Sequence, residues 1–586
     1  MINELFKIRG NQFYPRSSLF YSGRNLLVKK LILFTLLILF PVAIYSQKKC
    51  SNDFSKYLDN LPFVMGKISV PEFPDKDFCI TDFGAIGDGQ TLNTTAFEKA
   101  ISTCVENGGG RVVIPRGIWL TGPIWLKSNV NLHLEIGSHI QFTENKDAYP
   151  VIESYFEGVP QFRCASPING RNLVNVAITG DGIIDGNGDY WRYLKKDKVT
   201  EDFWNQLVKS GGVVAPDYGG WWPSQQALDG VKRLPELLKD DKLYTKENFE
   251  MIRDHLRPVL ISLIECKNVL LDGPTFQNSP AWNIHPLKCS NLIVRNINVR
   301  NPWYSQNGDG IDVESCKDVL IYNCKFDVGD DAICMKSGKG EYGRKRGIPT
   351  ENVVIADCIV YHGHGGFTVG SEMSGGVRNV KLSNLNFIGT DVGLRFKSTR
   401  GRGGIVENIF IEDIFMKDIP TDAIHFNLFY GGFAPKENES ELEQIKNAKE
   451  EEVNDGTPQF KNIKMKNIYC SGAAIAFDVR GLPEMPVQGI ELENVVIKSR
   501  KGISIYYGTG IKIVGSKILC SESPAINIIH GKDILIEQFE YADDANPVIK
   551  VDGMKTKNIV LKGLKKEVEN KIEFGKDVNE NVIIIE

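Results

Sequence analysis

The chain has 586 residues, of which 42% are hydrophobic and 24% charged, and its formal net charge is −4. This composition is that of a folded protein and excludes a disordered chain. The small net charge excludes a global field that would attract an anionic polymer, so we expect no nucleic-acid partner. The 56 glycines and the many Asn, Val and Ile residues favour short strands joined by turns.

The N-terminal residues resemble an export signal. A basic stretch from Arg24 to Lys30 precedes an apolar run from Leu31 to Tyr45 and the small Ser46. This order predicts a signal peptide over residues 1–46, with an extended leader at its start. The apolar run is too short for a comfortable membrane span, so we expect no stable membrane insertion after cleavage, with a retained signal anchor as the alternative. The sequence therefore predicts a periplasmic or extracellular protein, in which residues 47–75 form an N-terminal segment.

A short motif recurs along the chain: a polar residue is followed by Asn or Asp and then by an aliphatic residue. Its central positions are mostly 23 to 34 residues apart: Asn268, Asn291, Asp318, Asn352, Asn379, Asn408 and Asn462. A period in this range with alternating β-branched residues is typical of a stacked repeat that buries its apolar face against its neighbours. With about three short strands per repeat, the pattern predicts an all-β, parallel β-helix fold over residues 76–575.

Three other stretches depart from the repeat. The amphipathic pattern from Thr94 to Glu106 predicts a helix that caps the exposed end of the solenoid. Residues 187–255 and 434–457 interrupt the rhythm and are interpreted as insertions, the first rich in tryptophan and the second highly charged.

The twelve cysteines lack the compact spacing of a disulfide framework. Five of them fall at matching places in the repeats: Cys266, Cys289, Cys316, Cys324 and Cys358. We therefore expect buried thiols stacked in the core rather than disulfides. No CxxC pair indicates a metal site.

Two acidic segments on consecutive repeats are the strongest chemical signal. Asn307-Gly308-Asp309 reads as a strand whose first and third residues face outward, and Gly329 supplies a bend that lets Asp330 and Asp331 reach the same cleft. Three like charges raise at least one pKa, which keeps an acid beside two ionised bases near neutral pH. This favours acid/base chemistry on a sugar, although one Asp capping a turn is the alternative for either motif alone.

Histidine and cations follow on the next repeats. His364 lies between two glycines, with His362 as its competitor, and Arg395 and Lys397 then share one face of a strand. Two cations beside a carboxylate cluster suit an anionic sugar, whereas alone they would indicate a solvated face. The basic segment from Lys336 to Arg346, with Arg400 and Arg402, could form a cationic rim or a solvated loop.

In this order, the four segments resemble those of the polygalacturonase family, glycoside hydrolase family 28: Asn-x-Asp, Gly/Gln-Asp-Asp, Gly-His-Gly and Arg-Ile-Lys. The resemblance covers roughly residues 76 to 570, and it departs from the family pattern at Gly308 and Phe396, neither of which supplies a functional group. It implies a right-handed parallel β-helix that hydrolyses α-1,4-galacturonide bonds of pectin with inversion. The basic segment resembles loops of bacterial members that attack chain ends.

The resemblance also assigns roles to residues. The implied catalytic residues are Asp330, Asp309, Asp331 and His364, and the implied substrate-binding residues are Asn307, Arg395, Lys397 and Tyr430. Asp330 is the expected general acid, Asp309 and Asp331 would activate water, and His364 would tune the acid. Inversion predicts a gap of roughly 6.5 to 9.5 Å between acid and base carboxyls. No metal or organic cofactor is implied.

The expected partner is a pectic polysaccharide or oligogalacturonide. Alternatives are hydrolysis of rhamnogalacturonan or another uronide, and a non-catalytic carbohydrate-binding β-helix. A pectate lyase would need calcium-binding carboxylates and an arginine base. Exo or endo action, tolerated esters and oligomeric state stay open.

Overall fold

The computed structural model describes residues 54–432 and 440–586, and Tyr57–Glu586 forms one compact unit. The predicted signal peptide over residues 1–46 lies outside the described residues, as does part of the predicted insertion over residues 434–457. Within the described ranges, no helix is long and apolar enough to cross a membrane.

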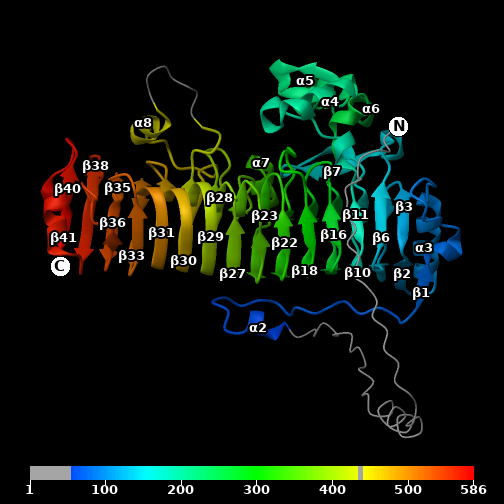
Figure 1. Ribbon diagram of the computed structural model, residues 1–586, viewed down its shortest axis with the longest axis horizontal. Coiled ribbons are helices and arrows are strands. Elements are labelled where there is room, and N and C mark those ends of the chain that lie inside the picture. The colour runs from blue at the N-terminus through cyan, green and yellow to red at the C-terminus, as the bar shows by residue number, and fades with distance from the viewer. Residues whose placement is uncertain (1–53, 433–439) are drawn as a thin grey trace, which may run out of the picture. The chain divides into compact units, whose positions relative to one another are not determined.

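The unit is a right-handed parallel β-helix, as the sequence predicts, with a 37-stranded parallel sheet in its described part (Figure 1). Each rung contributes one strand to each of three parallel stacks. The first stack contains β1 (Asp77–Cys79), β2 (Gly110–Ile114), β5 (Val130–Leu134), β10 (Val174–Gly180), β15 (Lys267–Asp272), β18 (Ser290–Arg295), β21 (Lys317–Tyr322), β24 (Thr350–Ala356), β32 (Gly508–Thr509), β33 (Lys512–Val514), β36 (Lys532–Glu537), β39 (Lys557–Lys562) and β41 (Ile583–Ile585).

The other two stacks follow in each rung. The second contains β3 (Gly117–Thr121), β6 (Ser138–Phe142), β11 (Ile183–Asp185), β16 (Thr275–Gln277), β19 (Asn298–Arg300), β22 (Lys325–Asp327), β25 (Ile359–Val360), β34 (Lys517–Cys520) and β37 (Glu540–Tyr541). The third contains β4 (Ile124–Trp125), β9 (Ile168–Arg171), β14 (Ile261–Ile264), β17 (Ile284–Leu287), β20 (Ile311–Glu314), β23 (Asp331–Lys336), β26 (Gly365–Val369), β28 (Val392–Lys397), β35 (Ile526–Ile529), β38 (Ile549–Asp552) and β40 (Ile572–Phe574). Four longer strands pass through more than one stack: β27 (Val377–Ile388), β29 (Ile405–Asn427), β30 (Gln459–Arg480) and β31 (Val487–Tyr506).

The recurring Asn and Asp residues form a ladder at one corner of the solenoid. From Asn268 to Asn462 they have φ between 51° and 57°, the left-handed conformation that Asn tolerates better than most residues. Their side chains bond across rungs: the amide of Asn379 donates to Asn352 at 3.1 Å, and that of Asn408 donates to Asn379 at 3.3 Å. The repeat detected in the sequence is therefore a repeated turn.

The interior is a continuous column of aliphatic, aromatic and cysteine side chains. Cys266, Cys289, Cys316, Cys324 and Cys358 are buried, and every cysteine of the described ranges is a free thiol. The prediction of stacked thiols in the core is confirmed.

The predicted helix is α3 (Thr94–Glu106), which contacts β1 and β2 at the first rungs. Its apolar face buries Phe97, Ala100, Ile101 and Cys104 in the solenoid core. The helix thereby covers apolar side chains that the first rung would otherwise expose.

Helical and antiparallel segments project from the solenoid. Within residues 187–255 lie α4 (Glu201–Lys209), α5 (Gln225–Leu237), α6 (Lys246–Glu250) and a hairpin of β12 (Val213–Ala215) and β13 (Gly220–Trp222). Each of these helices begins after a Ser or Thr whose hydroxyl accepts a backbone N–H, as Thr200 does for α4. A second hairpin joins β7 (Val151–Phe156) to β8 (Val159–Cys164).

Three short helices lie elsewhere in the described residues: α2 (Ser55–Leu58), α7 (Gly340–Arg346) and α8 (Glu441–Lys446). Figure 1 shows the segment with α4, α5 and α6 on the same edge of the solenoid as α8, with β23 and β28 between them. The insertions thus flank the rungs that carry the acidic motifs.

Candidate active site

The acidic motifs lie where the chain passes from the second stack to the third. Asn307 and Asp309 fall in the connection between β19 and β20, and Asn307 has a φ of 55°. The expectation that Asn307-Gly308-Asp309 is a strand is therefore wrong, because a left-handed residue interrupts extended backbone. Gly329 and Asp330 form the predicted bend, and Asp331 begins β23.

Two glycines leave room for this arrangement. A Cβ on Gly329 would lie 2.4 Å from Ser305 Oγ and 2.5 Å from the carbonyl oxygen of Pro302, in the loop that carries Asn307. A Cβ on Gly365 would lie 2.2 Å from Thr368 Oγ1 and 3.0 Å from Asp331 Oδ1. A larger residue at either position would displace a carboxylate-bearing segment.

The connection brings Asp309, Asp330 and Asp331 together, and one oxygen from each lies within 4.8 Å of the others. Asp309 and Asp331 are only 2% and 1% exposed, whereas Asp330 is partly exposed. These selected oxygens lie closer together than the roughly 6.5 to 9.5 Å expected between acid and base carboxyl groups. They approach this closely because two of the carboxylates are sequence neighbours and the third lies one rung away, about 4.8 Å along the solenoid.

Asp331 is held as a carboxylate. Its oxygens accept hydrogen bonds from Lys397 Nζ at 2.7 Å, Thr368 Oγ1 at 3.0 Å and Arg395 at 3.3 Å. Burial opposes its ionisation, but the charges of Lys397 and Arg395 outweigh burial and hold the pKa of Asp331 well below its usual range. The two cations predicted to contact substrate therefore also keep one base ionised.

The pKa of Asp309 is shifted in the opposite direction from that of Asp331. Burial, reinforced by the charges of Asp312 and Asp330, raises the pKa of Asp309 well above its usual range. Burial also raises the pKa of Asp312 to about 6. The carboxylates next to one another thus have pKa values displaced in opposite directions, as the sequence predicted for at least one member.

Lys336, the first residue of the basic segment, stabilises this buried acidic group. Its ammonium lies 3.2 Å from Glu372, 3.3 Å from Asp312 and 3.9 Å from Asp309. It also lies 4.2 Å from the centre of the Trp282 ring. Lys336 is therefore a structural cation beneath the carboxylates rather than part of a solvated rim.

The rest of the basic segment is also paired. Arg346 bonds Glu314 at 2.8 Å, Arg344 lies 3.1 Å from Asp455, and Arg400 lies 2.7 Å from Glu484. Because these cations have carboxylate partners, the segment acts as a cross-link between rungs.

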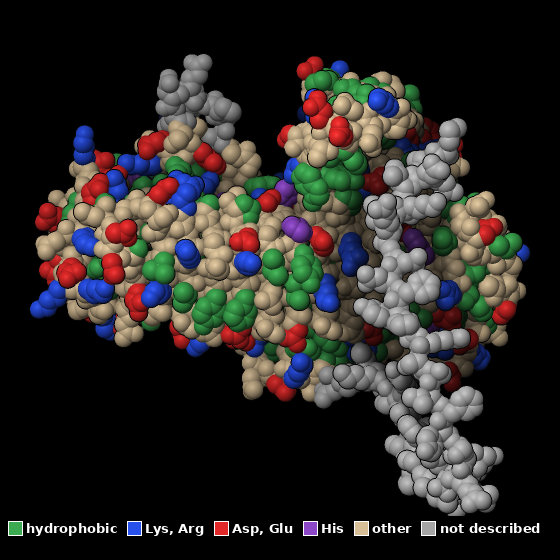
Figure 2. Space-filling model, in the orientation of Figure 1, with side chains coloured by type: hydrophobic (Ala, Val, Ile, Leu, Met, Phe, Trp, Pro, Cys, Tyr) green, Lys and Arg blue, Asp and Glu red, His purple; other side chains and the backbone are tan. Residues whose placement is uncertain are grey.

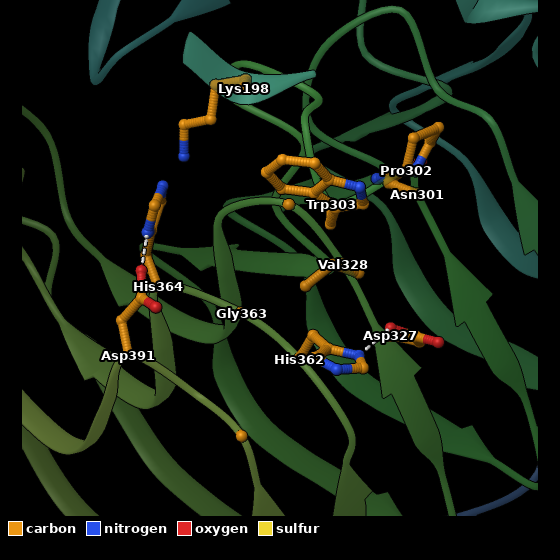
Figure 3. Close-up of a pocket in the computed structure, with 12 residues that line it drawn as sticks. Lys198, Asn301, Pro302, Trp303, Asp327, Val328, His362, Gly363, His364 and Asp391 are labelled. Carbon is orange, nitrogen blue, oxygen red and sulfur yellow. Dashed lines mark hydrogen bonds and ion pairs between the residues drawn. The ribbon is translucent and has the colours of Figure 1, made fainter. Parts of the chain in front are cut away.

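His364 and Asp391 point toward each other on one wall of a cavity of about 620 Å³ (Figure 3). The imidazole Nδ1 is hydrogen bonded to the Asp391 carboxylate, which raises the pKa of His364 against the opposing effect of burial. Trp303 and Lys198 lie on the opposite wall, and the Lys198 amine extends toward His364. His362 pairs instead with Asp327 at 2.8 Å. Histidine side chains are exposed on this face next to the projecting segment (Figure 2).

Tyr430 lies beside the two cations. Its ring centre is 5.0 Å from Lys397 Nζ and 5.8 Å from the Arg395 guanidinium carbon. Asn307 is held by Arg257, whose guanidinium donates to Asn307 Oδ1 at 2.8 Å. The structure thus brings every predicted site residue to one region of the solenoid surface.

A second cavity of about 520 Å³ begins at Asn307 and extends under the projecting segment. Its walls come from the β7–β8 hairpin and α5, with Phe156, Gln161 and Leu234 among the lining residues. The hairpin residue Phe156 packs in a buried cluster with Trp282. Fixed side chains therefore limit this side of the site.

A cluster of carboxylates with pKa values shifted in opposite directions, on a parallel β-helix, matches the paired acid and base of a glycoside hydrolase. The model for glycosyl hydrolases family 28 matches residues 243–465. A probable polygalacturonase of Vitis vinifera is 31% identical over 428 residues, which cover 71% of this chain and 73% of that protein. The chain belongs to glycosyl hydrolase family 28.

Two further relatives are bacterial. An exo-poly-alpha-D-galacturonosidase of Dickeya chrysanthemi is 31% identical over 359 residues, and the match spans 60% of this chain and 57% of that protein. The crystal structure of a hyperthermoactive exopolygalacturonase from Thermotoga maritima aligns with a TM-score of 0.62 and 33% identity, over 76% of this chain and 90% of that one.

Proposed function

We propose that this enzyme hydrolyses α-1,4-galacturonide linkages of pectin, as polygalacturonate or oligogalacturonides. One observation carries the proposal: three carboxylates lie beside two cations, namely Asp309, Asp330 and Asp331 beside Arg395 and Lys397. The carboxylates can act as acid and base, and the cations can bind an anionic sugar. The names of the Vitis and Dickeya relatives support the same substrate class.

In the proposed mechanism, Asp330 protonates the leaving glycosidic oxygen. It suits this role because it is the partly exposed member of the cluster and can reach a polymer. Asp309 and Asp331 are buried and would contact only the small attacking water. Asp331 stays ionised through Lys397 and Arg395 and accepts a proton from the water.

The remaining residues hold the sugar and the acid. Arg395 is 21% exposed at its side chain, so it can contact a uronate carboxylate while Lys397 stays on Asp331. Tyr430 stands next to both cations, where it would face the same sugar. The raised pKa of His364 favours its protonated form, which supplies a positive charge near Asp330. Asn307 lines the second cavity.

The stereochemical outcome is a separate proposal. The resemblance implies inversion, whereas the short separation of the carboxylates is closer to the roughly 5 to 5.5 Å of enzymes that retain configuration. We propose inversion with the water held between Asp309 and Asp331. Proton NMR during the first turnovers should show the β-anomer, and an α-anomer would instead indicate a covalent intermediate.

The decisive test uses polygalacturonate with EDTA present. Wild type should release reducing sugar without the ultraviolet-absorbing product of a lyase, and Asp330→Asn should lose at least roughly 10³-fold in kcat while keeping its thermal stability. Asp543→Asn, at a carboxylate that is 94% exposed, is the matched control. An active Asp330→Asn would remove Asp330 from its role, and cleavage of rhamnogalacturonan alone would reassign the substrate.

We further propose attack from chain ends. The hairpin and α5 line the cavity beyond Asn307, and the proposal is that their packed side chains block the path of a continuous polymer there. Hexagalacturonate should therefore yield a single small product from the first time points, followed by chromatography. A mixture of intermediate oligomers at the start would show an open, endo-acting cleft.

Export is proposed from the pattern of Arg24–Ser46, which matches a substrate found outside cells. N-terminal sequencing of protein recovered from the periplasm or medium should place the mature start near Gln47.

A further inference from the structure

The cavity beside Asn307 that is lined by the β7–β8 hairpin and α5 has an aromatic wall. Tyr193 stacks on Trp222 with ring centres 4.5 Å apart and an interplanar angle of 12°, and Trp222 stacks on His255 at 5.8 Å. The volume of about 520 Å³ is in the roughly 300–1,000 Å³ range of small-ligand sites. The space therefore suits one end of an oligosaccharide rather than a continuous polymer.

Two arginines line this cavity, and both are almost fully buried. Arg163 is 5% exposed and Arg257 is 8% exposed. Their hydrogen bonds go to neutral oxygens: Arg163 donates to Gln161 Oε1 and the Arg257 carbonyl, and Arg257 donates to the carbonyls of Pro280 and Gln306 and to Asn307 Oδ1. Arg163 Nε is buried with no hydrogen-bond partner.

No carboxylate in the part of the chain that the structure describes pairs with either guanidinium. Glu157 lines the same cavity, but its carboxylate pairs with Lys339 at 3.3 Å. A buried charge without a counter-ion is costly, and a guanidinium usually avoids that cost through an ion pair. Burial and the charge of Arg257 together lower the pKa of Arg163 to about 9. Lys195 and Asp217 also line the cavity, but Arg163 and Arg257 are its buried guanidinium groups without a carboxylate partner among the described residues, and an anion would stabilise their charges.

The position and shape of the cavity restrict that anion. A carboxylate is planar and matches the paired N–H groups of a guanidinium, and an aromatic wall packs against the face of a sugar ring. Arg257 bonds Asn307, two residues before Asp309, so the ligand would adjoin the reacting groups. Burial raises the pKa of Tyr193 against the opposing charge of Arg257, and the charge of Asp330 contributes in the same direction as burial.

We propose that this cavity binds the terminal uronate of the substrate and that Arg163 and Arg257 recognise its carboxylate. The inference rests on the proposed function and on attack from chain ends. It assigns to this chain a specificity for chain ends that carry a free carboxylate, set by the β7–β8 hairpin rather than by the acidic motifs.

Arg163 is the residue to change, because Arg257 also holds the loop of Gln306 and Asn307. Arg163→Met keeps an unbranched stem against the Phe156 ring, which lies 4.1 Å from the guanidinium carbon, and removes the charge. The substrates are tetragalacturonate and the same oligomer with only its non-reducing terminal carboxyl methyl-esterified.

For wild type, we expect terminal esterification to reduce kcat/KM by roughly 10- to 100-fold, the range for a charge-assisted hydrogen bond. Arg163→Met should lose a similar factor on the free acid but no more than about 3-fold on the ester. Arg163→Lys should keep part of the preference. Arg171→Met is the matched control, since this arginine is exposed and donates to the hairpin carbonyl of Glu153 outside the cavity.

Two outcomes would overturn the inference: wild type that cleaves both oligomers equally, or Arg163→Met that lowers both rates by the same factor. The wild-type comparison stands even if Arg163→Met does not fold. Calorimetry with galacturonate and its methyl ester separates the two proposals. Suppose that wild type binds galacturonate but not its methyl ester, that Arg163→Met loses this binding, and that tetragalacturonate is not cleaved. This result would refute the proposed function but support the carboxylate-recognition site.

Discussion

The imidazole of His364 is oriented by Asp391, which lies 27 residues further along the chain on the next rung. The carboxylate favours the protonated imidazole and raises its pKa. A proton is therefore kept on His364 to higher pH than on a free histidine, which preserves positive charge near Asp330.

Replacing Asp391 with Asn should lower the pKa of His364, because the negative partner is removed while a hydrogen-bond acceptor remains. The imidazole then loses its proton at lower pH. If His364 must be charged, the alkaline limb of the kcat/KM profile should move to lower pH by about one unit. Asp327→Asn, which alters the equivalent pair with His362, should leave the limb in place. An unmoved limb in Asp391→Asn would separate His364 from the titration.

Replacing Lys397 with Met tests the pairing with Asp331. Removal of one partner of a buried ion pair should reduce the free energy of unfolding by roughly 3–5 kcal/mol at pH 7. The pKa of Asp331 is lowered in the folded protein, so its contribution to stability is present above the unfolded pKa of about 3.9 and is lost as pH falls. The difference between wild type and Lys397→Met should therefore shrink below about pH 5 in urea titrations. A difference independent of pH would show that Asp331 is not the partner that matters.

The site residues divide by how their contacts are made. Asp309, Asp330, Asp331, His364, Arg395 and Lys397 occur in short local motifs, so sequence alone could nominate them. Asp391, Lys336 and Thr368 act through contacts between rungs, such as the 37 residues that separate Thr368 from Asp331. Those contacts depend on the length of each connection and on strand register, which no local pattern contains.

At the scale of elements, the Asn ladder combines backbone conformation with side-chain bonding. Each member adopts a left-handed turn, and each Asn of the ladder donates its amide to the rung before it. An Asn residue supplies both properties, whereas most residues supply neither.

Asn379 allows the two contributions to be measured separately. Asn379→Gly loses the side-chain bonds but keeps easy access to φ of 57°, and Asn379→Ala loses both. The alanine variant should be less stable than the glycine variant by about 1–2 kcal/mol, measured by urea unfolding. Equal stabilities would assign the ladder to hydrogen bonding alone.

The sequence predicted the repeat, the three strands per rung and the helix from Thr94 to Glu106, because each follows from a regular pattern of apolar residues. It did not predict the β7–β8 and β12–β13 hairpins. Their strands are antiparallel and lie outside the 37-stranded sheet, so they do not follow the pattern of the repeat. The strand expected at Asn307 was wrong because alternation over three residues cannot distinguish a strand from a turn.

At the scale of the whole molecule, each rung packs only on its neighbours. In such a solenoid, stability is a sum of local terms, and distant rungs can open separately. The candidate site residues, from Asn307 to Tyr430, lie in the middle rungs.

Ile549→Ala and Ile284→Ala make the same cavity in different rungs, since both side chains are fully buried in the third stack. Each should cost roughly 2–5 kcal/mol. Ile549→Ala should increase hydrogen exchange in β35, β38 and β40 and leave kcat unchanged. Ile284 lies beside Gly310 and the Asp309 loop, so Ile284→Ala should also reduce kcat. Equal loss of activity in both variants would show that the solenoid unfolds as one unit.

The ladder continues past the insertions. Asn268 bonds Asn175 at 2.9 Å across 93 residues of chain, and Asn291 bonds Asn268 at the same distance across 23. Asn462 likewise bonds Asn408 across 54 residues. A connection can therefore lengthen by a whole helical segment while the flanking rungs keep their alignment. Evolution could thus add new walls beside an existing scaffold without moving the rungs that hold Asp309, Asp330 and Asp331.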